Sequence, residues 1–168
     1  MGTVYLEMSP EEAQFAASSF PQYTKNNGTN FPVSGLAFDG AADEAAFWSF
    51  IATSYGSGNL TLEIFWYADS TTSGDVIWDA QIAAITPNTD SQDVETKSFA
   101  TATSVTDSHL GTTAQRLHSC SITISNLDSL ASGDQVWLRL NRDANNASDT
   151  LNSVDAIVTK LRLSWSDT

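Results

Sequence analysis

The sequence contains very little cysteine and histidine. Its single cysteine, Cys120, cannot form a disulfide within the chain, and it lies among strand-forming residues, which favours a buried and unreactive thiol. Two histidines and one cysteine at these spacings match no known zinc-binding pattern. We therefore expect neither a disulfide framework nor a metal or other cofactor. A chain of 168 residues can bury roughly 70% of its unfolded surface, so its fold does not require a disulfide or a bound metal for stability.

Long apolar runs are also missing. No segment approaches the ~18 consecutive apolar residues that a membrane-spanning helix requires, so we expect no membrane partner. The first fifteen residues hold three glutamates and no lysine or arginine, which is unlike a secretory signal. We therefore expect the protein to be made and assembled in a cytoplasm.

Positive charge is scarce. Seven lysines and arginines stand against 20 aspartates and glutamates, which gives a net charge of −13. The imbalance lies almost entirely in residues 1–96, whose only basic residue is Lys25. Such a charge repels nucleic-acid phosphates and anionic membranes, so nucleic acid is not an expected partner. The acidic half is either a solvated surface that keeps the protein soluble or a face for a basic partner.

Catalytic constellations are absent as well. Neither His109 nor His118 has a nucleophile motif nearby, such as Gly-x-Ser-x-Gly. Most acidic residues stand at turns, and only Glu63 and Asp79 lie in the middle of expected strands, both on outward faces. The oxygen-rich segment 143–149 lacks the glycine and the final glutamate of an EF-hand loop and fits an ordinary turn. We therefore do not expect an enzyme.

What the sequence does contain is a series of short strands separated by polar turns. The phrase Ser-Gly-Asp occurs at 73–75 and at 132–134, and each time it opens a run of β-branched and aromatic residues. The clearest strand, 60–68, places its leucines, Ile64 and Trp66 on one face. The other expected strands are residues 33–38, 45–53, 76–85, 97–105, 117–124, 135–142 and 154–165.

These strands predict the fold class. About eight short strands with almost no helix are typical of an all-β chain, here an antiparallel β-sandwich of jelly-roll type. An immunoglobulin-type sandwich is less favoured, because the Cys…Trp…Cys core signature is absent. In the last strand, the inward face is expected to carry Ile157, Leu161, Leu163 and Trp165.

Residues 1–30 differ from the rest, and we interpret them as an N-terminal arm outside the main core of a domain spanning 31–168. The run Ser9-Pro10-Glu11-Glu12 predicts a helix of about two turns, with Ser9 as N-cap and Glu12 completing a capping box. A frayed terminus is the alternative. The arm is rich in aromatic residues, which favours docking on its own domain or on a neighbouring subunit. The aromatic residues concerned are Tyr5, Phe15, Phe20, Tyr23 and Phe31.

Three aromatic residues of the sandwich are expected on outward faces. Phe65, Tyr67 and Trp137 each alternate with the inward residues of their strand. The position of Phe65 and Tyr67 indicates cover by the arm, by a loop or by another subunit. Outward aromatics such as Trp137, Tyr67 and Tyr55 also fit sugar stacking, although most tryptophans lie in phase with core residues.

Several segments of the sequence resemble small jelly-roll structural proteins of tailed bacteriophages. Proteins of this group serve as head decoration (cement) proteins or as tail and fibre modules. The segments concerned are 36–44, 73–78, 133–144 and 148–165, so the resemblance covers about residues 31–168. It is a pattern of strands and turns and transfers no binding residue. It implies a non-enzymatic component of the virion that associates with itself, commonly as a trimer.

Two functions follow from the resemblance. The favoured one is a head decoration protein that binds the major capsid protein or another virion protein and stabilises the shell. Its interfaces would use the exposed aromatics Tyr5, Phe15, Phe20, Tyr23, Phe65, Tyr67 and Trp137. The alternative is a tail or fibre module with a receptor- or carbohydrate-binding role, in which a glycan is the partner. A free carbohydrate-binding domain that uses Trp137 is the rival from another class.

Overall fold

The computed structural model describes residues 2–168, and Met1 lies outside the described residues. This part of the chain forms ten strands and one short 3₁₀ helix, η1 (Pro10–Glu12). The strands are β1 (Thr3–Met8), β2 (Gln22–Asn26), β3 (Val33–Phe38), β4 (Glu44–Ile51), β5 (Leu60–Tyr67), β6 (Gly74–Ile85), β7 (Thr103–His109), β8 (His118–Ile124), β9 (Gln135–Arg142) and β10 (Ala156–Ser166).

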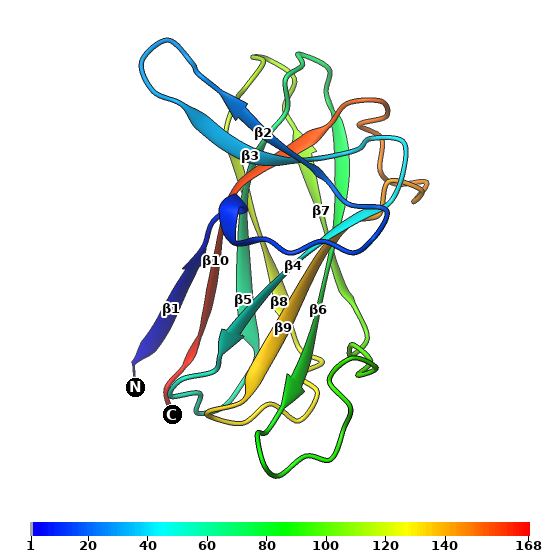
Figure 1. The fold of residues 1–168 in the computed structure, drawn as a ribbon. Helices are drawn as coiled ribbons and strands as arrows, with labels where there is room; N and C mark the ends of the chain where they lie inside the picture. The colour runs from blue at the N-terminus through cyan, green and yellow to red at the C-terminus, as the bar shows by residue number, and fades with distance from the viewer. Residues whose placement is uncertain (1) are drawn as a thin grey trace.

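The strands form two antiparallel sheets that pack face to face (Figure 1). One sheet has six strands, in the order β2-β3-β10-β5-β8, with β1 also paired to β10. The other has four strands, in the order β4-β9-β6-β7. Thr3 pairs with Ser166, so the two ends of the described chain lie side by side. The predicted all-β antiparallel sandwich is confirmed.

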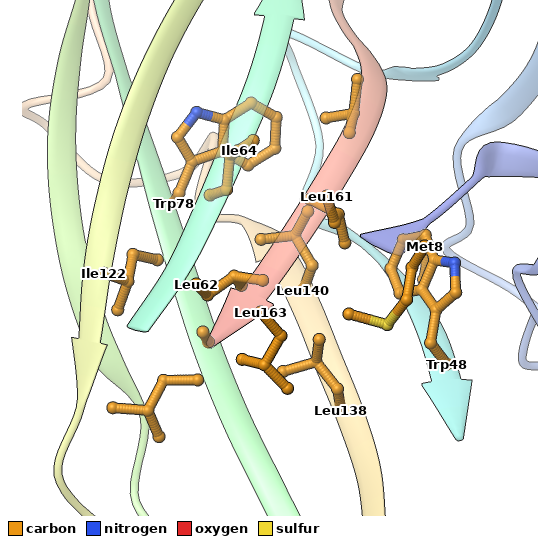
Figure 2. Packing of buried hydrophobic residues seen from close by; sticks show 14 of the residues in the cluster. Met8, Trp48, Leu62, Ile64, Trp78, Ile122, Leu138, Leu140, Leu161 and Leu163 are labelled. Carbon is orange, nitrogen blue, oxygen red and sulfur yellow. The ribbon is translucent and has the colours of Figure 1, made fainter. Parts of the chain in front are cut away.

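The core between the sheets follows the alternation of the strands. The inward side chains of β5 and of the facing strands β6 and β9 are fully buried, as their sequence pattern predicts. Figure 2 shows Leu62 and Ile64 from β5 packed with Leu138 and Leu140 from β9. Each such side chain stabilises the fold by roughly 1.5–3 kcal/mol, so this core is the main source of stability.

Strand β10 departs from the predicted alternation at one position. The register of β10 against β5 shifts between Val158 and Lys160, so a β-bulge reverses the faces there. Val158 is therefore in the main core, whereas Ile157 lies on the opposite face beside Tyr67. The prediction that Ile157 shares the inward face with Leu161 is wrong, because an inserted residue shifts the period-two pattern by one.

The interpretation of residues 1–30 as an arm outside the core needs correction. Strand β1 pairs with β10 over six residues, and Met8 is buried in the main core. Strand β2 pairs with β3 through the Gln22–Asn26 register, across the expected boundary at residue 30. The predicted helix is a single 3₁₀ turn, in which the Glu12 carboxylate accepts hydrogen bonds from the Ser9 N–H and hydroxyl. The segment therefore contributes two strands to the six-stranded sheet.

Strand β7 begins later than the sequence predicts. The weak pattern over 97–105 lacks large residues at alternate positions, and the strand runs from Thr103 instead. Residues 97–102 form a loop, in which the Ala100 N–H donates to the Ile82 carbonyl at 2.9 Å. This loop places Phe99 against the outward side chain of Phe47, with 6.0 Å between the ring centroids.

A buried ion pair fixes the segment that precedes β10. The Arg142 guanidinium donates to both carboxylate oxygens of Asp149, at 3.0 and 2.8 Å, and both side chains are fully buried. The same guanidinium donates to the carbonyls of Phe38, Leu151 and Val154. Because every N–H direction is used, the charge is compensated where water is excluded.

Candidate functional site

A cleft crosses the outward face of the four-stranded sheet, opposite the core. Its volume is about 310 Å³. Aromatic side chains from four separate segments line it, together with three polar side chains. We call it the aromatic cleft, and the residues that define it are Gln14, Phe15, Phe47, Glu95, Lys97, Phe99 and Trp137.

Trp137 is the central aromatic residue of the sheet face within the aromatic cleft. It lies on β9 between two small cross-strand neighbours, Ser49 on β4 and Ala83 on β6. Its half-buried indole is therefore not enclosed by large residues from the adjacent strands. Phe47 is the outward residue of β4 that precedes Ser49, and it pairs with Arg139 of β9. The two rings make an apolar floor on the outside of the sheet.

Two segments outside the sheet form the walls of the cleft. On the β4 side, Gln14 and Phe47 exchange backbone hydrogen bonds of 2.7 and 3.0 Å, which fixes Phe15 at the cleft. On the β6 side, Lys97 makes an ion pair of 2.9 Å with Asp128 and so anchors the loop that carries Glu95 and Phe99. The cleft therefore depends on two anchored segments that are far apart in the sequence.

Hydrogen bonds between neighbouring residues hold the polar side chains beside the aromatic floor in fixed orientations. Arg139 donates to the Gln81 amide oxygen at 2.8 Å and to the Asn141 amide oxygen at 3.1 Å. Gln81 in turn donates to the Ala100 carbonyl at 2.9 Å. Among the residues that line the cleft, Glu95 is the only carboxylic acid. The cleft thus offers aromatic faces and hydrogen-bonding groups, without the pair of carboxylates that glycoside hydrolysis uses.

The structure brings only some of the sequence-predicted interface residues together. Phe15 and Trp137 line the aromatic cleft, and Phe20 packs against Phe15 with 5.6 Å between the ring centroids. Tyr23 is exposed at β2 and donates a hydrogen bond of 2.9 Å to Glu11. This bond and the backbone N–H of Glu11 lower the pKa of that carboxyl group, the backbone bond being the larger cause.

Tyr5, Phe65 and Tyr67 lie on the outward face of the six-stranded sheet instead. The Arg162 guanidinium lies 5.7 Å from the ring centroid of Tyr5 and 5.9 Å from that of Phe65, and it is paired with Glu63. Tyr67 is buried against Ile157 and accepts a hydrogen bond of 3.0 Å from Asn26. The expected cover of Tyr67 by the N-terminal segment is therefore present, whereas a subunit interface at these residues stays a prediction.

Sequence reasoning missed half of the aromatic cleft. Phe47 is out of phase with the inward residue Trp48, so alternation could have identified it as outward. Phe99 carries no such signal, because it lies in a loop. Of the three aromatics considered for sugar stacking, only Trp137 lies in the cleft. Tyr55 donates to the Gly58 carbonyl at 2.7 Å and burial raises its pKa, and Tyr67 is buried.

The single cysteine of the chain, Cys120, is half-buried and forms no disulfide. Burial raises the pKa of the Cys120 thiol, which stays protonated, as expected for an unreactive cysteine. In this part of the chain no three His, Cys, Asp or Glu side chains gather in a way that could hold a metal ion. The same residues include no helix that is long and apolar enough to span a membrane.

The chain matches no protein-family model and no curated protein sequence. Among solved structures, it is similar to a CBM35 from Cellvibrio japonicus Abf62, with a TM-score of 0.54 and 16% identity over 95% of this chain and 92% of that one. A family 35 carbohydrate binding module from Clostridium thermocellum gives a TM-score of 0.54 and 13% identity, over 95% and 97% of the two chains. The CBM22-1 xylan-binding domain from Paenibacillus barcinonensis Xyn10C gives 0.51 and 8%, over 94% and 91%.

At these identities the similarity concerns the fold. It confirms the jelly-roll β-sandwich, which the chain shares with these modules over nearly its whole length. The bacteriophage part of the resemblance finds no support in them, because all three are carbohydrate-binding modules. The chain is thus a jelly-roll β-sandwich whose similar structures include carbohydrate-binding modules.

Proposed function

We propose that the protein is a non-catalytic carbohydrate-binding module whose ligand lies in the aromatic cleft. The observation that carries the proposal is the position of Trp137. Its indole lies on an outward sheet face between Ser49 and Ala83, in a cleft that also contains Phe15 and Phe47. The jelly-roll fold is compatible with this function but does not assign it.

The chemistry of the aromatic cleft suits a neutral sugar chain. The C–H faces of a sugar ring are apolar and pack on flat aromatic rings, whereas its hydroxyl groups require hydrogen-bonding partners around the edge. Trp137 and Phe47 provide the rings, and Gln14, Glu95 and Lys97 provide donors and acceptors. The net charge of −13 disfavours an acidic polysaccharide.

Binding without cleavage follows from the acids available. Glycoside hydrolysis uses two carboxyl groups about 5–9.5 Å apart on either side of the scissile bond. Glu95 is the single carboxylic acid among the residues that line the cleft. We therefore expect a glucan or xylan oligosaccharide to bind and to be recovered intact.

The Trp137→Ala variant tests this proposal. Affinity for neutral β-linked glucan and xylan oligosaccharides, measured by calorimetry, should fall about tenfold or more, because one aromatic contact is lost. The urea midpoint of unfolding should stay close to that of the original chain, since Trp137 points away from the core. Tyr23→Ala, which removes an exposed aromatic outside the cleft, serves as the matched control. Failure of the unmodified chain to bind any of these sugars would eliminate the proposal.

A second candidate function is a virion structural protein, as the phage resemblance implies. The observation that favours it is the outward face of the six-stranded sheet, where Tyr5 and Phe65 flank Arg162. Aromatic residues and arginine are enriched in the centres of protein interfaces. In this case the chain would associate with itself or with the major capsid protein. Its oligomeric state in solution separates this function from the first.

A further inference from the structure

A second cavity, of about 780 Å³, lies on the other side of the molecule from the aromatic cleft. It is bounded by the β2–β3 hairpin, which projects from one end of the sandwich in Figure 1, by the end of β5 and by the β7–β8 loop. We call it the hairpin pocket. Its principal residues are Asn26, Phe31, Tyr67, Asp69, Gln115 and Leu117.

The hairpin pocket exposes two large apolar side chains that the core does not use. Phe31 is 68% exposed and Leu117 is 61% exposed, although both line the cavity. Gly28 at the hairpin tip has φ +58°, and a Cβ there would collide with the Phe31 carbonyl, so the tip that presents Phe31 requires glycine. Exposed apolar surface gathered around a cavity is typical of a ligand site.

The polar groups of the hairpin pocket are held in place. Asn26 donates to the Tyr67 hydroxyl at 3.0 Å, and the Gln115 amide contacts the Asp69 carboxylate. Asn30 adds a further side-chain amide. The lining residues include no lysine, arginine or histidine, and Asp69 is the only charged one. An anionic ligand is therefore disfavoured, and amide and hydroxyl groups are the natural partners of this set.

We propose that the hairpin pocket is a second ligand site, separate from the aromatic cleft, that binds N-acetylated amino sugars. The acetamide N–H and carbonyl suit the amides of Asn26 and Gln115, and the acetyl methyl suits the apolar wall of Phe31 and Leu117. The hydroxyl groups of the sugar suit the remaining polar groups. The site belongs to the same broad ligand class as the proposed function, but it uses none of the residues of the aromatic cleft.

The test titrates the whole chain with N,N′-diacetylchitobiose and, as a matched ligand, with cellobiose, which carries hydroxyl groups in place of the two acetamides. In Trp137→Ala, which lacks the central ring of the aromatic cleft, chitobiose should bind and cellobiose should bind about tenfold more weakly or not at all. Cellobiose would cover the exposed amides of Asn26 and Gln115 without pairing them. Leu117→Ala and Phe31→Ala should each weaken chitobiose binding about tenfold. Leu110→Ala is the matched control, since Leu110 is 50% exposed in the same loop and does not line the pocket.

The Trp137→Ala variant separates this proposal from the first. Chitobiose affinity should be unchanged in Trp137→Ala, because Trp137 does not line the hairpin pocket. Its loss in that variant would place the sugar in the aromatic cleft and overturn the second site, while the proposed function stands. Absence of chitobiose binding, or equal binding of cellobiose and chitobiose by the Trp137→Ala variant, would also overturn the second site. If the chain binds chitobiose but no glucan or xylan, the aromatic cleft is excluded as a sugar-binding site, and the second site stands.

Discussion

At the scale of single residues, the two histidines form the most distinctive polar cluster of the interior. The rings of His109 and His118 lie 5.1 Å apart, beside Trp66, and the Nε2 atom of each is buried without a hydrogen-bond partner. Asp107 accepts a hydrogen bond of 2.7 Å from the Trp66 indole. Burial, and then the charge of His109, lower the pKa of His118, with Asp107 acting in the opposite sense.

The lowered pKa of His118 predicts a pH dependence of stability. Its ordinary value is 6.5, so below this pH the unfolded chain binds the proton more readily than the folded chain. The contribution of His118 to the free energy of unfolding is therefore full above pH 6.5. It is lost as the pH falls through the pKa that His118 has in the folded chain. Urea denaturation at pH 7.5 and 5.5 should show a smaller drop in the free energy of unfolding for His118→Gln than for the unmodified chain.

Two acids with a raised pKa, Glu44 and Asp155, act in the other direction, which makes the comparison between variants necessary. Burial is the largest cause that raises the pKa of Glu44 and of Asp155, so protonation of these groups favours the folded chain as the pH falls. Both acids are present in His118→Gln, so they cancel in the difference between the two proteins. An identical drop in both proteins would show that His118 does not titrate as its burial implies.

At the scale of elements, β1 turns a terminal segment into part of the fold. It pairs with the C-terminal half of β10, whereas β3 pairs with the N-terminal part of the same strand. Its last residue, Met8, lies in the core cluster with Trp48, as Figure 2 shows. The indole of Trp48 donates to the Ser9 carbonyl at 3.0 Å and fixes the chain directly after the strand.

The position of Met8 predicts the cost of loosening β1. Met8→Ala should lower the free energy of unfolding by about 2–5 kcal/mol, because it removes a buried side chain and leaves a cavity. Thr3→Ala, on an exposed position of the same strand, should change it by less than about 0.5 kcal/mol. Urea denaturation measures both. A neutral Met8→Ala would mean that β1 lies outside the cooperative core after all.

At the scale of the whole molecule, charge and surface shape decide how copies of the chain meet. The net charge of −13 makes copies repel one another. On the outward face of the six-stranded sheet, Arg162 is already engaged by Glu63 and by the rings of Tyr5 and Phe65. We therefore expect a monomer of 18.1 kDa by light scattering, and the same mass for Phe65→Ala. A trimer that Phe65→Ala dissociates would contradict this and favour the virion function.

The candidate site could be predicted only in part. Trp137 was identifiable because it alternates with the buried residues of its own strand, a property that local sequence contains. Phe15 was identifiable only as an aromatic of the N-terminal segment. Its place beside Trp137 depends on the bridge between Gln14 and Phe47, which are 33 positions apart. The hairpin pocket likewise combines Phe31 with Leu117, which no local pattern connects.

Local sequence patterns were sufficient to predict the fold class and most inward faces. A strand places alternate side chains on opposite faces whatever its partner is, and the Ser132-Gly133-Asp134 turn directly precedes β9 as predicted, whereas Gly74 and Asp75 already belong to β6. Long-range pairing placed β1 and β2 in the six-stranded sheet, moved Ile157 outward through a bulge, and brought four distant aromatics into one cleft. These features depend on which strands pair and in which register, and pairing between distant segments is set by the packing of the whole chain.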